Sequence, residues 1–333
     1  MAIAATPAKM TTIASFPENF FLENLAVRAD GSILVSVLNH KQLWHVPAPL
    51  SDRAVKPTLV HTFDNFAMGI VEAEPDVFYV STARQATLER LDLRDWSPGA
   101  PVRSTRVLTF DDTTVLNGSC LIEPRVILLA DSLGGRIWRV DLADNGFEAT
   151  SSVWLQHHTM APDPGNGLVS VLGPQPGING IHYAERTSSV YYTSTAQKLF
   201  MRVPVDPTTF APVGPPEAVA SEIVADDFCI DENAAVAYLT THTDNTIVCV
   251  SIDPGAESPI RSVVAGNPFT TQLVGPSSAA WAREPAAYGR IAYVTTDGGH
   301  TAVEYGRPGS DGTIRPAEVL LVEFDGEVGA STS

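Results

Sequence analysis

Four oxygen-bearing side chains, far apart in the chain, are the strongest candidates for chemistry in this sequence: Glu23, Asn117, Asn179 and Asp226. Each stands where a turn leads into an apolar, strand-like segment. Carboxylate and amide oxygens suit a hard divalent cation such as Ca²⁺, Mg²⁺ or Mn²⁺ far better than a thiophilic metal. The alternative is that Asn-Gly and Asp-Asp are ordinary turn residues. The four positions act together only if the fold brings them together.

The elements that must position them form an internal repeat. Six segments, each an apolar strand followed by a turn and by strands rich in Val, Tyr and Thr, begin 45, 49, 62, 47 and 51 residues apart, near Glu23, Met68, Asn117, Asn179, Asp226 and Ser277. Repeats of this length with short β-branched strands predict an all-β, six-bladed β-propeller with four-stranded blades around a central channel. The whole chain, residues 1–333, is then a single domain.

Closure of the ring and convergence of the site follow from that fold. The terminal strands, around residues 11–16 and 319–324, are expected to share one blade. The first strand of each blade lines the channel, so the residues that begin the repeats meet at one mouth. We therefore predict Asp226, Asn117, Asn179 and Glu23 as catalytic residues.

The interval of 62 residues contains an apolar insertion, residues 151–178. Long loops in compact folds are usually functional or disordered. We expect this one to form a lid over a channel mouth, with Trp154 and His158 facing the substrate; packing on the outer rim is the alternative.

Apolar residues also cluster near the starts of the repeats, and these predict a hydrophobic ligand. Any one of them could instead belong to the core between blades. His242, in a turn after a second strand, is added as a binding residue, whereas strand alternation predicts that His182 points away from the channel. Together with Trp154 and His158, the predicted substrate-binding residues are Phe20, Phe21, Phe66, Met68, Leu116, Ile178, Phe228 and His242.

Composition excludes several classes of partner. The 333 residues contain 21 Lys and Arg against 38 Asp and Glu, a formal charge of −17, which disfavours nucleic acid. No stretch approaches 18 apolar residues, so we expect no membrane span. Three cysteines without CxxC spacing, and an N-terminus without a secretory signal pattern, predict a cytoplasmic protein. The oligomeric state stays open.

Several short motifs resemble those of the SMP-30/gluconolactonase/LRE-like family of six-bladed propellers. Residues 23–27 (ENLAV) resemble the family's E-x-P-V-W segment, Asn117-Gly118 its N-G blade, residues 177–181 (GINGI) its P-N-G-I segment, and residues 226–231 (DDFCID) its D-G-x-x-x-D segment. The resemblance implies that Glu23, Asn179 and Asp226 would be metal ligands. It also implies that Asn117 faces substrate and that Asp226 is a general acid or base.

The departures from the family pattern change the expected function. The sugar-lactonase members carry an arginine where this chain has Val115, a glycine where it has Asp227, and a proline where it has Leu25. Intracellular fungal relatives with an ENLAV-like motif include hetero-Diels–Alderases of tropolone–sesquiterpenoid biosynthesis. The resemblance thus implies a pericyclase for hydrophobic polyketide or terpenoid substrates.

Two alternatives remain open: a metal-dependent lactonase or esterase, and a non-catalytic small-molecule-binding propeller. The expected cofactor is accordingly either none or one divalent cation, and the expected partner is a hydrophobic small molecule.

Overall fold

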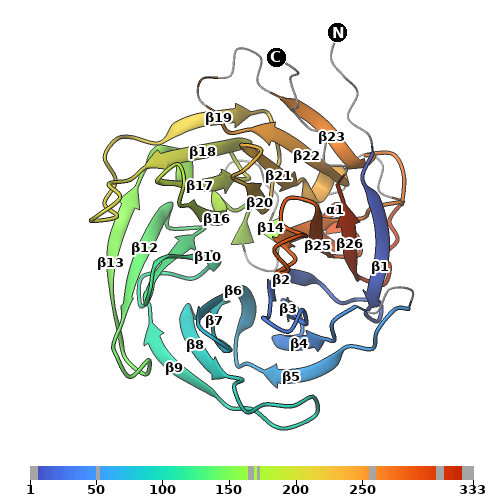
Figure 1. The fold of residues 1–333 in the computed structure, drawn as a ribbon, viewed down its shortest axis with the longest axis horizontal. Coiled ribbons are helices and arrows are strands. Elements are labelled where there is room, and N and C mark those ends of the chain that lie inside the picture. The colour runs from blue at the N-terminus through green and yellow to red at the C-terminus, as the bar shows by residue number, and fades with distance from the viewer. Residues whose placement is uncertain are drawn as a thin grey trace.

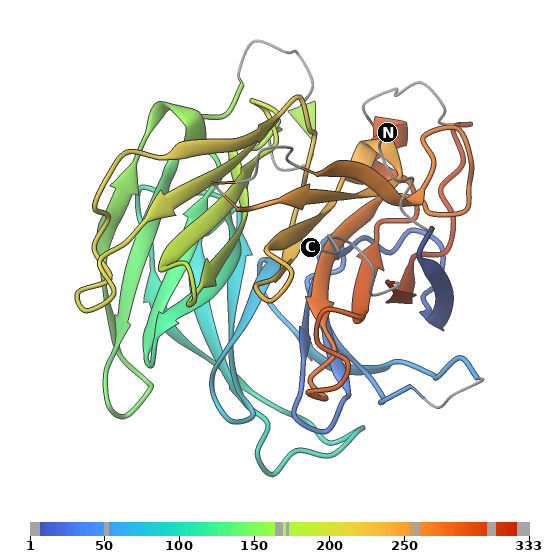
Figure 2. The ribbon, with the colours of Figure 1, turned by 45° about the horizontal axis from the view of Figure 1, so that its top comes forward.

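Six sheets of four antiparallel strands stand in a ring around a central axis, in a computed structural model that describes residues 7–49, 53–163, 169–170, 173–253, 255, 260–304 and 311–324 (Figure 1). The innermost strands of successive sheets contact one another around the whole ring. The view turned by 45° shows the sheets as blades about this axis (Figure 2). The prediction of an all-β, six-bladed propeller is confirmed.

The first three blades follow the chain in order, and their strands are β2 (Leu22–Val27), β3 (Ile33–Val37), β4 (Gln42–Val46) and β5 (Thr58–Thr62); β6 (Phe66–Glu74), β7 (Val77–Ala83), β8 (Thr87–Asp92) and β9 (Ser104–Thr109); and β10 (Leu116–Glu123), β11 (Val126–Asp131), β12 (Arg136–Leu142) and β13 (Ala149–Gln156). The other three are β16 (Ile178–Ala184), β17 (Ser189–Ser194), β18 (Leu199–Pro204) and β19 (Glu217–Ser221); β20 (Phe228–Asp231), β21 (Val236–Thr240), β22 (Thr246–Ser251) and β23 (Arg261–Gly266); and β24 (Pro276–Trp281), β25 (Ile291–Thr296), β26 (Glu318–Glu323) and β1 (Lys9–Ser15). Between blades lie the short elements η1 (His158–Met160), β14 (Val169–Ser170) and β15 (Gly173–Pro174), and within blades η2 (His242–Asp244) and α1 (His300–Glu304).

The sixth blade closes the ring with strands from both ends of the chain. β1 pairs antiparallel with β26, with Thr11 opposite Leu321. The Lys9 ammonium lies 2.9 Å from the Glu323 carboxylate at the outer edge. The prediction that the terminal strands share a blade is therefore confirmed.

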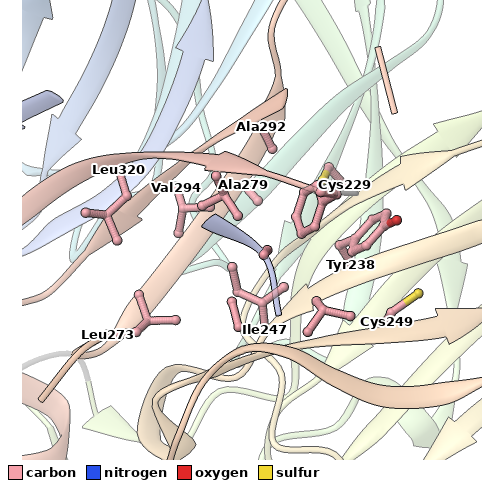
Figure 3. Packing of buried hydrophobic residues seen from close by; sticks show 14 of the residues in the cluster. Cys229, Tyr238, Ile247, Cys249, Leu273, Ala279, Ala292, Val294 and Leu320 are labelled. Carbon is pink, nitrogen blue, oxygen red and sulfur yellow. The ribbon is translucent and has the colours of Figure 1, made fainter. Parts of the chain in front are cut away.

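Side chains packed between neighbouring blades form the core. Figure 3 shows one such interface, in which Tyr238 and Ile247 of blade 5 meet Val294 and Leu320 of blade 6. The Tyr238 ring stacks on Phe324 with centroids 4.1 Å apart. Each blade buries its apolar faces only against its neighbours, as expected for a repeat fold.

Close approach of the innermost strands shapes the channel. A register shift occurs near the start of β2, β6, β10, β16 and β24. In three blades a glycine lies at this register shift, where a side chain would collide with the next blade. A Cβ on Gly118 would lie 2.6 Å from the Asn179 carbonyl oxygen, and a Cβ on Gly69 would lie 2.4 Å from the Asn117 carbonyl oxygen. Hydroxyl groups of the second strands also tie adjacent blades, since Ser81 Oγ donates to the Asn117 carbonyl at 2.9 Å.

Different parts of the predicted lid, residues 151–178, belong to different elements of the structure. Its first part, through Gln156, is the outer strand β13 and not a lid. The next turn is anchored, because Met160 is fully buried and Gln197 Nε2 donates to the carbonyls of His158 and Ala161 at 2.6 and 3.1 Å. Residues 164–168 and 171–172 of the predicted lid lie outside the described residues. Near its end, Pro174, Gln175 and Pro176 line a cavity at the channel mouth.

Candidate functional site

A cavity of about 350 Å³ opens at one mouth of the channel. Its wall is built by the starts of innermost strands and by the turns between second and third strands. All four predicted catalytic residues line it, as do three of the predicted binding residues, Phe21, Met68 and His242. The propeller therefore brings together side chains from five blades.

The other predicted binding residues do not line the cavity: Phe20, Phe66, Leu116, Ile178, Phe228, Trp154 and His158. Leu116 and Ile178 each neighbour a residue that lines the cavity, so strand alternation turns them into the core between blades. Phe228 also packs in this core, and all three side chains are fully buried.

The remaining four are held elsewhere by contacts of their own. Phe20 stacks on His40, and Trp154 Nε1 donates from β13 to the Phe210 carbonyl at 3.0 Å. Phe66 lies behind Met68, under the Arg84 guanidinium. His158 belongs to the anchored turn η1.

One imidazole bridges two buried carboxylates in the wall of the cavity. His242 Nδ1 lies 2.5 Å from Asp226 Oδ2, and its Nε2 lies 2.9 Å from Asp297 Oδ2. The backbone N–H groups of Gly299 and Thr301 donate to Asp297 at 2.6 and 2.8 Å. Asp297 and its two backbone donors belong to blade 6. This blade therefore holds the hydrogen-bonded row Asp226–His242–Asp297 in place.

Charge in this row shifts the ionisation of its members. Burial alone would lower the pKa of His242, but Asp226 and Asp297 together raise it well above its usual value. Burial would raise the pKa of Asp297, but His242 and the two N–H groups lower it overall. Burial, followed by repulsion from Asp226, raises the pKa of Glu23 to about 8, so Glu23 is largely protonated at neutral pH.

Several polar groups of the cavity have no hydrogen-bond partner among the described residues. They include the Glu23 carboxyl and the Asn117 amide, on blades 1 and 3, with exposed fractions of only 7% and 6%, and also Thr243 Oγ1 and His300 Nε2. Asn179, by contrast, donates from Nδ2 to Asp226 Oδ1 at 2.5 Å and to Thr195 Oγ1 at 3.0 Å. Buried polar groups are nearly always paired, so Glu23 and Asn117 are among the positions at which a bound molecule would supply the partner.

Blades 1 to 3 contribute an apolar wall to the same cavity. It consists of Leu38, Met68, Val115 and Leu133, which pack together as one cluster with Phe66 and Ala83 behind them. In a ring of six, blade 2 with Met68 faces blade 5 with Asp226. The cavity therefore has an apolar side and an ionic side.

The donor set does not fit the divalent cation that the family resemblance implies. Within the described part of the chain, no group of three or more His, Cys, Asp or Glu side chains is arranged to hold a metal ion. Both oxygens of Asp226 already accept hydrogen bonds, one from Asn179 and one from His242. Of the predicted ligands, Asp226 therefore has no oxygen that is without a hydrogen bond.

A second polar cluster, around Asp227, links four blades next to the residues that line the cavity. Asp227 Oδ2 accepts from Ser278 Oγ at 2.6 Å and from Asn24 Nδ2 at 3.2 Å, and its Oδ1 lies 3.0 Å from His182 Nε2. These partners come from blades 6, 1 and 4. The prediction that His182 points away from the channel is wrong, because the register shift between Ile178 and Ile181 breaks the strict alternation of β16.

Sequence reasoning missed Asp297, His300, Leu38 and Leu133 as members of the site. All four lie at or near turns between the second and third strands of their blades, and only Asp297 does not itself line the cavity. The one available signal was that Asp297 directly follows a β-branched second strand, as Asp131 ends another.

Comparison with known proteins agrees with this architecture. The chain matches no model of a protein family. It is 24% identical over 332 residues, covering 88% of this chain and 79% of the relative, to the protein named "Putative hetero-Diels-Alderase asR5" from Sarocladium schorii. These findings support the resemblance to the SMP-30/gluconolactonase/LRE-like propellers.

Solved structures share the fold at low sequence identity. A luciferin-regenerating enzyme has a TM-score of 0.65 and 13% identity, with 96% of each chain covered. A gluconolactonase from Xanthomonas campestris has a TM-score of 0.54 and 13% identity, with 98% of this chain and 99% of that chain covered. At this identity the likeness establishes the propeller fold alone.

In the part of the chain that the structure describes, no helix is long and apolar enough to cross a membrane. The three cysteines Cys120, Cys229 and Cys249 are buried and free.

Proposed function

We propose that the cavity binds a hydrophobic polyketide- or terpenoid-type substrate and promotes a (hetero-)Diels–Alder cycloaddition in secondary metabolism. The observation that carries the proposal is the pairing of an apolar wall with two buried polar groups, Glu23 and Asn117, that have no hydrogen-bond partner in the described part of the chain. A molecule with one carbonyl and a large apolar body matches both sides. The relative named as a hetero-Diels–Alderase supports the same reaction class.

The chemistry needs orientation more than a strong base or nucleophile. Fixing a heterodiene against an alkene in one geometry can contribute about 7–11 kcal/mol to lowering the barrier. A hydrogen bond to the heterodiene carbonyl adds electrostatic assistance as electron density moves to the oxygen. The Asn117 amide donates this bond, and the protonated Glu23 carboxyl is placed in the same wall to donate a second.

The test is a cycloaddition between an o-quinone methide released in solution and a hydrophobic alkene. We expect the protein to raise the initial rate above the uncatalysed reaction and to give product with an enantiomeric excess. Racemic product at the background rate, despite measured binding of either reactant, would leave a small-molecule-binding propeller as the better description.

The contribution of the apolar wall is tested by Leu133→Ser. Because Leu133 lines the cavity, the substitution weakens apolar binding, and we expect KM to rise more than kcat falls. The matched control is Leu59→Ser on the outer strand β5, where the side chain is exposed. Equal effects of the two substitutions would contradict binding at this wall.

The hydrogen-bonded pair of Asp226 and His242 favours a second candidate, hydrolysis of a lactone or ester. A carboxylate paired with an imidazole can accept a proton from water as it attacks a carbonyl. The gluconolactonase among the structural neighbours is compatible with this reading. Hydrolysis of a hydrophobic lactone that is abolished by EDTA and by Asp226→Asn would favour the metal-dependent hydrolase over the cycloaddition.

A cytoplasmic location forms part of the proposal. Three buried, free thiols are typical of a reducing compartment.

A further inference from the structure

The carboxylate of Asp226 has both of its oxygens engaged by neighbouring side chains. Asn179 Nδ2 donates to Oδ1, and His242 Nδ1 contacts Oδ2, each at 2.5 Å. A cation of the kind expected from the family resemblance would need at least one of these oxygens. An imidazole therefore already lies against one of the two oxygens that such a cation could use.

Asp297 holds this imidazole in position from the far side. Its Oδ2 lies 2.9 Å from His242 Nε2, and the Thr301 hydroxyl lies 3.1 Å from the same nitrogen. Asp297 itself sits in a tight cradle, because a Cβ on Gly275 would lie 1.7 Å from its Oδ1. The Phe21 ring covers the His242 ring at 5.5 Å between centroids and 28° between planes. The imidazole therefore has little freedom to leave Asp226.

We propose that His242, braced by Asp297, occupies the position on Asp226 that a divalent cation would otherwise take, so that the site is complete without a metal. Each ring nitrogen faces a carboxylate oxygen, and the ring supplies N–H donors where a cation would supply positive charge. Binding a cation at Asp226 would require the ring to move away and would leave the fully buried Asp297 carboxylate without its charged partner, with only the two backbone N–H donors.

The proposal predicts that removing the ring uncovers a metal site. Protein dialysed against EDTA and then buffer is titrated with MnCl₂ by calorimetry and by electron paramagnetic resonance, in the wild type and in His242→Ala. We expect no saturable Mn²⁺ binding in the wild type up to about 1 mM, and binding of one Mn²⁺ at least ~10-fold tighter in His242→Ala. The gain should disappear in His242→Ala/Asp226→Asn.

A matched control is His300→Ala, a second histidine of the same cavity that does not contact Asp226. It should gain no Mn²⁺ binding, which distinguishes freeing Asp226 from merely enlarging the cavity. Circular dichroism and thermal unfolding establish that each variant is folded. If His242→Ala does not fold, Asp297→Asn, which loosens the ring from the far side, should show the same gain to a smaller degree.

Two results would overturn the proposal. One is stoichiometric Mn²⁺ binding by the wild type that is lost in Asp226→Asn. The other is a folded His242→Ala protein that binds Mn²⁺ no better than the wild type. Neither measurement needs a substrate, so their failure is distinguishable from failure of the proposed cycloaddition.

Discussion

Two adjacent layers of the channel use similar residue types for opposite purposes. The cavity ring consists of the residues that begin the innermost strands and line the cavity: Glu23, Met68, Asn117, Asn179 and Asp226. The closing ring consists of the residues directly after them and after Ser277: Asn24, Gly69, Gly118, Gly180, Asp227 and Ser278. None of the closing ring lines the cavity.

The difference lies in how the polar groups are paired. In the closing ring, Asp227 joins Asn24, Ser278 and the nearby His182 across the axis, and the glycines leave no side chain to separate the strands. In the cavity ring, Glu23 and Asn117 have no hydrogen-bond partner among the described residues. Paired buried polar groups stabilise a fold, whereas unpaired ones cost stability and mark positions for a ligand.

Among the variants that distinguish the two rings, Asp227→Ala is expected to have the largest effect on stability. It removes the carboxylate that links four blades and leaves the Asn24 amide and the Ser278 hydroxyl without their partner. We expect the free energy of unfolding to fall by about 3–4 kcal/mol in urea denaturation. A loss below about 1 kcal/mol would show that the closing ring does not hold the blades together.

Gly118→Ala tests the close approach of blades 3 and 4. The added Cβ would lie 2.6 Å from the Asn179 carbonyl oxygen, so the strands must separate. We expect a loss of about 2–3 kcal/mol in the free energy of unfolding. Gly214→Ala is the matched control, because nothing lies within 4 Å of its added Cβ. Equal stability of the two variants would contradict the packing described for this layer.

Glu23 predicts a pH dependence of stability. Its pKa is raised from 4.5 to about 8 in the folded protein, chiefly by burial, so the folded state binds this proton more tightly than the unfolded state. Stability from this group is complete below pH 4.5 and is lost as the pH rises toward 8. Between pH 6 and pH 8 we expect a loss of about 2 kcal/mol in the wild type.

Glu23→Gln should flatten that dependence, whereas Glu18→Gln, at an exposed position of the preceding loop, should keep it. Urea denaturation at pH 6, 7 and 8 measures all three proteins. An unchanged slope in Glu23→Gln would mean that Glu23 is ionised in the folded state at neutral pH.

The sequence predicted the architecture well because the repeat is local. Turn residues, β-branched strands and their spacing recur within each segment, and they suffice for the six blades and for the convergence of Asp226 with Asn117, Asn179 and Glu23. The shared terminal blade follows because a strand is present at each end.

What the sequence did not predict depends on register and on contacts between distant segments. His182 faces Asp227 because of a register shift in β16 that no residue type announces. Asp297 lies 55 residues from His242, and only the ring geometry makes them partners. The sequence also does not distinguish a residue near the start of a repeat from a residue whose side chain faces the channel. For this reason it predicts Leu116, Ile178 and Phe228 in the cavity, whereas they pack in the core.

The most direct test of the central claim measures stability and catalysis on the same variant, Asn117→Ala. If the Asn117 amide is kept for a bound carbonyl, the unfolding free energy should change by less than about 1 kcal/mol, while the rate of the o-quinone methide cycloaddition falls about 10- to 100-fold. An unchanged rate accompanied by a loss of stability like that of Asp227→Ala would contradict the distinction between the two rings.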